Sequence, residues 1–119
     1  MNLKNKIHTI YLEYLLCLQL KKIGIPQQHA SAYWNKTDKQ VYQADRVTKF
    51  KGWESIFTAA LTAEDLQQYL PSGSKIEKLT HGVFSATHPA YSFSGVAPQL
   101  AGSIARFMIH LHKHGKLKI

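Results

Sequence analysis

The residues best suited to chemistry in this chain are cations that gather towards its end. The stretch from Arg106 to Ile119 carries one arginine, three lysines and three histidines. No aspartate or glutamate occurs from Lys78 onward, so no acid that is close in sequence neutralises these cations. A cationic surface of this kind attracts a polyanion, and the commonest polyanion in a cell is nucleic acid. The stretch therefore predicts a class of partner rather than a reaction.

The composition of the whole chain supports the same expectation. Its 119 residues hold 15 Lys and Arg against 7 acids, which gives a formal net charge of +8 at pH 7. An apolar share of 45% with 18% charged residues is typical of a folded domain rather than a disordered segment. This length predicts a single domain over residues 1–119. We therefore expect a basic, folded, nucleic-acid-binding protein.

The spacing of apolar residues predicts the elements that position these cations. Helices are expected over residues 7–20, 27–34, 53–61 and 96–111, and a hairpin over residues 75–87. Thr62 and Asp65 have the spacing of a capping box, which predicts a short helix, and Gly115 predicts the end of the last one. Residues 35–51 fit neither period and stay open between strand and helix. The expected fold class is mainly α with a small β-hairpin (α+β), in one compact domain.

The last predicted helix carries a motif of its own. Arg106 stands near its start, apolar residues follow at three-residue steps, and Gly115 precedes an aliphatic residue. This pattern resembles the end of the recognition helix of winged helix-turn-helix domains. The resemblance implies a winged-helix-like fold in which residues 94–102 supply the preceding helix and turn. It also implies that Arg106 and His110 face a DNA groove, as in a small DNA-binding regulator of transcription or an accessory factor.

Basic residues from the middle and from the end of the chain make up the predicted binding face. Its members are Arg46, Lys49, Lys51, Arg106, His110, Lys113, His114 and Lys116. We expect these cations to attract the phosphates of duplex DNA, with limited groove contact from the last helix. In the middle stretch the cations alternate with Phe50 and Trp53, a pattern that also suits stacking on single-stranded bases. The preferred interpretation places both of these rings in the core.

Other functions remain open. An acidic protein surface attracts the same cations, so the alternative is a protein-interaction module. Such a module would be an inhibitor or adaptor that docks on an acidic partner or on a nucleic-acid-binding machine. Catalysis is not expected, because no histidine has an obvious carboxylate partner. His110 and His114 stand one helical turn apart and could reach one metal ion. No acid or cysteine accompanies them, however, so no metal or other cofactor is expected.

The apolar run that contains Cys17 indicates the cellular compartment in which we expect the protein. Cys17 is the single cysteine and lies in an apolar run, which excludes a disulfide framework and suits a reducing compartment. Glu13 interrupts this run and no small-residue cleavage motif follows it, so we expect neither a leader peptide nor a membrane span. The expected location is the cytoplasm.

Overall fold

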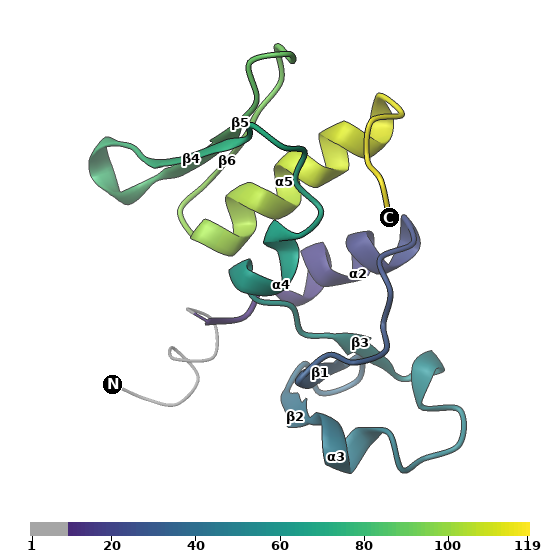
Figure 1. Cartoon of the computed structure of the whole chain (residues 1–119). Coiled ribbons are helices and arrows are strands. Elements are labelled where there is room, and N and C mark those ends of the chain that lie inside the picture. The colour runs from purple at the N-terminus through teal and green to yellow at the C-terminus, as the bar shows by residue number, and fades with distance from the viewer. Residues whose placement is uncertain (1–9) are drawn as a thin grey trace. The chain divides into compact units, whose positions relative to one another are not determined.

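Two three-stranded antiparallel sheets organise the chain, one in each half. The computed structural model describes residues 10–119. The chain divides into unit 1, Met1–Leu61, and unit 2, Thr62–Ile119, and each is described by itself (Figure 1). None of the helices in the described range has the length and hydropathy that crossing a membrane requires.

Unit 1 is built on the sheet with strand order β2-β1-β3. Its elements in chain order are helix α2 (Tyr14–Lys22), strands β1 (Ala32–Asn35) and β2 (Val41–Gln43), the one-turn helix α3 (Ala44–Val47), the 3-10 turn η1 (Trp53–Ser55) and strand β3 (Phe57–Ala59). Tyr33 of β1 lies opposite Tyr42 and Ala59 in the register of its two neighbours. Because neighbouring side chains on a strand alternate between faces, Tyr33 and Trp34 pack on opposite sides of this sheet.

Both faces of the first sheet bury aromatic side chains. On one face, the Trp34 indole N–H donates to the Leu12 carbonyl at 3.0 Å, and the ring meets Tyr14 of α2 edge to face. On the other face, the Tyr33 ring lies 4.8 Å from that of Trp53 in η1. Trp34 and Tyr33 are 2% and 0% exposed, so these two residues form the centre of unit 1.

Cys17 provides a direct test of the packing in unit 1. Its thiol is fully buried and donates to the Leu12 carbonyl oxygen, and burial raises its pKa to about 12. Since the thiolate is the reactive form, we expect the native protein to resist iodoacetamide at pH 8, and the denatured protein to be alkylated at once. Mass spectrometry measures the extent of alkylation, and Cys17 is the single cysteine in the chain. Alkylation of the native protein as fast as of the denatured one would contradict this packing.

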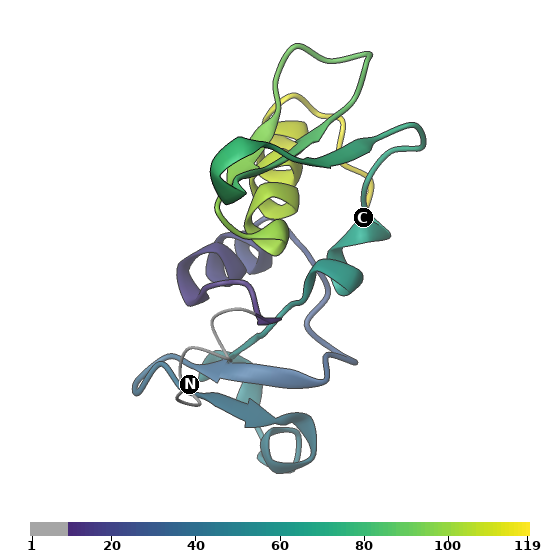
Figure 2. The ribbon, with the colours of Figure 1, turned by 90° about the vertical axis from the view of Figure 1, so that its left-hand side faces the viewer.

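Unit 2 is a β-meander against which one long helix packs. Its elements are helix α4 (Ala63–Gln67), strand β4 (Lys75–Lys78), the 3-10 turn η2 (Thr80–Gly82), strands β5 (Phe84–Thr87) and β6 (Gly95–Ala97), and helix α5 (Leu100–Lys113). The strand order is β4-β5-β6. Figure 2 shows the yellow-green helix α5 lying across the green strands. Ala86, Phe107 and Leu111 are completely buried between the sheet and the helix.

Small residues allow α5 to approach the edge strand β6 closely. A Cβ atom placed on Gly95 would lie 2.0 Å from the Ser103 carbonyl oxygen and 2.4 Å from the Phe107 nitrogen. A Cβ on Gly102 would lie 3.0 Å from that of Ala97. The helix therefore rests on the strand backbone itself at Gly95, an approach that only glycine allows.

The predicted fold class, mainly α with a small β-hairpin, is wrong. The structure is α+β with substantial sheet. Predicted helix 27–34 overlaps strand β1, and predicted helix 53–61 contains η1 and β3. Residues 94–102, expected to supply a helix before the last one, contain β6 instead. Strands β1 and β3 have four and three residues, and consecutive side chains in each are buried on both faces of the sheet. In such strands apolar and polar residues do not alternate along the sequence. The spacing of the apolar residues therefore happened to resemble that of a helix.

Several local predictions are confirmed. Thr62 and Asp65 cap α4 reciprocally: the Thr62 N–H donates to Asp65 Oδ2 at 2.9 Å, and the Asp65 N–H donates to Thr62 Oγ1 at 3.2 Å. The hairpin is present as β4 and β5. Gly115 ends α5 with φ +69°, and Lys116 N–H donates to the Leu111 carbonyl at 2.7 Å. The predicted first helix is shorter than expected, since α2 begins at Tyr14, and residues 7–9 lie outside the described range.

Candidate nucleic-acid interface

Helix α5 carries a stripe of basic side chains along one side. Arg106, His110 and Lys113 are four and three residues apart, so they lie above one another on the helix. The opposite side is buried in the core of unit 2. Arg106 is the one exposed side chain between Ala101 and Met108, a stretch that is otherwise buried all round. The exposed cations are therefore Arg106 and those at the C-terminal end of the helix.

A single aromatic ring organises the histidines at this end. The Phe93 ring, from the loop between β5 and β6, stacks on the His114 ring at 4.5 Å with the planes 5° apart. It also lies 5.9 Å from the His110 ring, 5.1 Å from the Tyr91 ring and 5.8 Å from the Phe107 ring. Phe93 thus fixes both imidazoles at the helix end. The sequence pattern did not reveal this role, since Phe93 lies in a loop without clear periodicity.

Within the described part of the chain, no carboxylate pairs with the cations at the end of α5. Among residues 10–119 the one ion pair is that of Lys75 with Glu77, at 3.5 Å. The other two acids of unit 2, Glu64 and Asp65, lie in the first turn of α4. Arg106, Lys113, His114 and Lys116 are all exposed. We call the set Arg106, His110, Lys113, His114 and Lys116 the α5 cation site.

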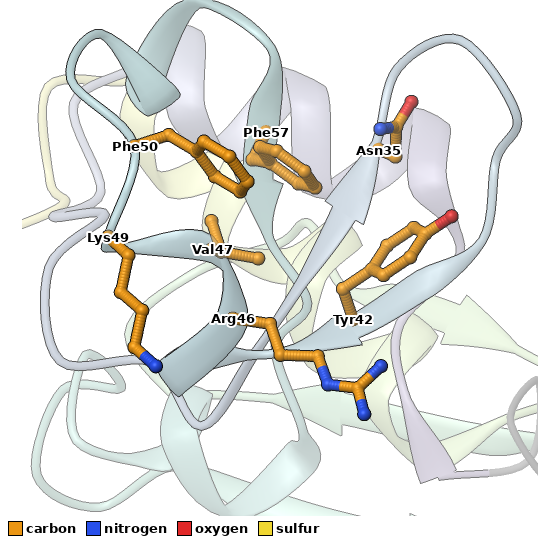
Figure 3. A pocket seen from close by; sticks show the side chains of 7 residues that line it. All are labelled: Asn35, Tyr42, Arg46, Val47, Lys49, Phe50 and Phe57. Atoms are coloured by element: carbon orange, nitrogen blue, oxygen red, sulfur yellow. The ribbon is translucent and has the colours of Figure 1, made fainter.

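The middle group of predicted residues lies around a pocket of unit 1 with a volume of about 520 Å³ (Figure 3). Its lining residues are Asn35, Tyr42, Arg46, Val47, Lys49, Phe50 and Phe57. Asn35 lies opposite Phe57 in the sheet register, and Tyr42 lies opposite Tyr33, two residues before Asn35. These three lining residues therefore share one face of the sheet, which α3 and the following turn complete.

A hydrogen bond holds the Tyr42 side of the pocket. The Tyr42 hydroxyl donates to Asp38 Oδ2 at 2.5 Å, and its ring meets Phe57 edge to face at 5.9 Å. This hydrogen bond lowers the pKa of the Asp38 carboxyl and raises the pKa of the Tyr42 hydroxyl. Asp38 is ionised and Tyr42 is protonated at neutral pH, so the hydrogen bond that holds the ring is present there.

Phe50 is the clearest departure from expectation in this region. The preferred interpretation placed Phe50 and Trp53 in the core, and Trp53 is buried with 8% exposed. Phe50, however, is 61% exposed and faces Tyr42 across the pocket (Figure 3). The prediction is therefore right for Trp53 and wrong for Phe50.

The eight predicted binding residues fall into two groups. Arg46 and Lys49 come together at the pocket of unit 1, and Lys51 is exposed outside its lining. The five members of the α5 cation site belong to unit 2. Sequence reasoning missed Tyr42, Phe57 and Asn35, because only the register of β1 with its neighbours brings them together.

Comparison with known proteins found no similar protein. No family model, no curated protein and no solved structure matches this chain. Within the range that the structure describes, no three His, Cys, Asp or Glu side chains gather in a way that could hold a metal ion. The candidate interface is therefore defined by its own geometry and charge.

Proposed function

We propose that the protein binds nucleic acid, duplex DNA above all, through phosphate contacts made by the α5 cation site. The observation that carries this proposal is that exposed Arg106, Lys113 and Lys116 have no ion-pair partner among the described residues. Cations left free in this way gain most from a phosphate backbone, whose condensed counterions they release. Duplex DNA is favoured because it has one negative charge per about 1.7 Å of its axis.

The burial of helix α5 limits the ways in which it can contact DNA. Its first turns are covered except at Arg106, so the helix does not offer a long free face for insertion into a groove. We expect the basic end to lie against the phosphates, with the imidazoles of His110 and His114 held by Phe93 beside the lysines. Phosphate contacts position a protein without reading sequence. Binding should therefore depend weakly on base sequence.

A salt titration tests this proposal. Three phosphate contacts, from Arg106, Lys113 and Lys116, predict that log affinity falls against log salt with a slope of about −3 on any duplex. The double variant Arg106→Ala, Lys113→Ala should flatten the slope by about 2 units and lower the affinity at low salt at least roughly tenfold. Electrophoretic shift or fluorescence anisotropy with unrelated duplexes measures both quantities.

The double variant Lys75→Ala, Lys78→Ala is the matched control. It removes two positive charges from exposed positions on β4 of the same unit, and we expect a much smaller change of slope. Equal losses in the two double variants would show that net charge acts without the α5 cation site. No duplex binding at low salt would reject the function and favour the alternative, docking on an acidic protein.

A further inference from the structure

One aromatic side chain that lines the pocket of unit 1, Phe50, is largely exposed and lies outside the buried core. Phe50 leaves the turn after α3 with 61% of its surface exposed, and it stands across the opening from Tyr42 (Figure 3). Val47 and Phe57, which are 1% and 8% exposed, form the apolar floor between them. A flat apolar group that entered this space would meet aromatic surface on its sides and aliphatic surface beneath.

The two charged side chains that line the pocket are both positive. Arg46 and Lys49 contribute to the lining, and neither forms an ion pair with any residue in the described range. Two acids are close in sequence, Asp38 and Asp45, but neither belongs to the lining. Asp38 already accepts hydrogen bonds from the Tyr42 hydroxyl and the Gln40 N–H. Asp38 keeps its negative charge beside Tyr42, outside the lining, and the charges of the lining itself are positive.

The pocket also has a hydrogen-bond donor at its edge. Asn35 Oδ1 accepts from the backbone N–H groups of Thr37 and Asp38, at 2.8 and 3.2 Å. These bonds orient the amide so that its oxygen faces the loop, and its NH₂ has no partner among residues 10–119. A donor of this kind suits a carbonyl oxygen on a flat ligand.

We propose that this pocket binds an unpaired base of single-stranded nucleic acid, stacked on Phe50, with the adjoining phosphate contacted by Arg46 and Lys49. Base stacking on exposed aromatic rings beside a basic groove is how proteins bind single strands without reading sequence. A nucleotide is the ligand that combines a flat ring, carbonyl oxygens and a phosphate within one unit. The volume of about 520 Å³ lies in the range of ligand-binding pockets.

A polymer fits these features better than a free small anion. The chain has a formal net charge of +8, so its field attracts a strand of many phosphates more strongly than one carboxylate or phosphate. The pocket is open, and Phe50 stands at its exposed side, so the strand can continue past the bound base (Figure 3). This inference goes beyond the proposed function, since it concerns another unit and an unpaired strand.

Calorimetry with two oligomers of equal length and charge tests the stacking. One is oligothymidylate and the other is the same phosphodiester chain without bases. We expect the wild-type protein to bind the thymidylate roughly 5- to 150-fold more tightly, the range for one stacked base. Phe50→Ala should bring the ratio of the two affinities close to one, and Phe50→Tyr should restore it. Arg46→Ala should weaken both oligomers and leave the ratio unchanged.

Two matched variants make the result specific. Leu15→Ala shortens another exposed apolar side chain of unit 1, 64% exposed on α2, and should leave the ratio unchanged. Lys22→Ala removes an exposed charge from the same helix and should affect neither oligomer as much as Arg46→Ala. Equal affinity of the wild-type protein for both oligomers would overturn the proposal, and so would a ratio that Phe50→Ala leaves intact.

The ratio of the affinities for oligothymidylate and the abasic chain also distinguishes binding at this pocket from binding at the α5 cation site. In the variant Arg106→Ala, Lys113→Ala the preference for thymidylate over the abasic chain should persist, because it arises from Phe50. If duplex binding is absent and the preference remains, the proposed function fails and the pocket proposal stands. If duplex binding is present and the preference is absent, the reverse holds.

Discussion

Replacing Gly95 with alanine is expected to destabilise unit 2 by about 3 kcal/mol or more. The new methyl group would lie 2.0 Å from the Ser103 carbonyl oxygen and 2.4 Å from the Phe107 nitrogen, both backbone atoms of α5. A side chain could rotate away, but a helix backbone must move as a body. That movement would open the packing of Phe107 and Leu111 on the sheet. Denaturant unfolding and hydrogen exchange of the α5 amides measure the loss.

Gly115→Ala is the matched control for this substitution. Gly115 ends α5 with φ +69°, and a Cβ there would meet nothing within 4 Å. Only the backbone conformation disfavours alanine at that position, which costs about 1 kcal/mol. We therefore expect a clear difference between the two glycine variants. Equal, small losses would show that α5 does not rest on β6 as closely as described.

Replacing Trp34 with alanine should have the largest effect in unit 1, about 3–5 kcal/mol. The ring is 2% exposed, lies edge to face against Tyr14, and donates to the Leu12 carbonyl at 3.0 Å. Removal leaves a cavity on the α2 side of the sheet. Trp53, in the same unit, remains as a fluorescent reporter for a denaturant titration.

Trp34→Phe separates packing from hydrogen bonding. Phenylalanine keeps most of the buried ring but cannot donate to Leu12, so we expect a loss of about 1 kcal/mol for the hydrogen bond and somewhat more for the missing atoms. Cys17 also donates to the Leu12 carbonyl, so that oxygen would not be left without a partner. A Phe variant as unstable as the Ala variant would contradict a role based mainly on packing.

The two candidate sites differ in how far the sequence revealed them. The α5 cation site follows from a run of basic residues on one helix, and helical spacing places Arg106, His110 and Lys113 on one side. The pocket draws its residues from β1, β2, β3, helix α3 and the turn after it. Arg46, Lys49 and Phe50 stood out as basic residues beside an aromatic one. Tyr42 and Phe57 did not, because strand pairing alone brings them there.

The sequence also did not predict which aromatic side chains are exposed to solvent. Phe50 and Trp53 are three residues apart in a similar local context, yet Phe50 is 61% exposed and Trp53 is 8% exposed. The difference arises because Trp53 meets Tyr33 on the face of the first sheet. Likewise, Phe93 acquires its role only because α5 brings His110 and His114 beside the loop that follows β5.

By itself, the sequence determined the features that depend on neighbouring residues or on composition. These are the positive charge, the capping box before α4, the hairpin of β4 and β5, and the end of α5 at Gly115. Tertiary structure decided that residues 32–35 and 57–59 are strands, since each finds its hydrogen-bond partners in a distant segment. It also decided which cations share a surface with aromatic rings. Local patterns specify local hydrogen bonds, whereas short buried strands are specified by partners far along the chain.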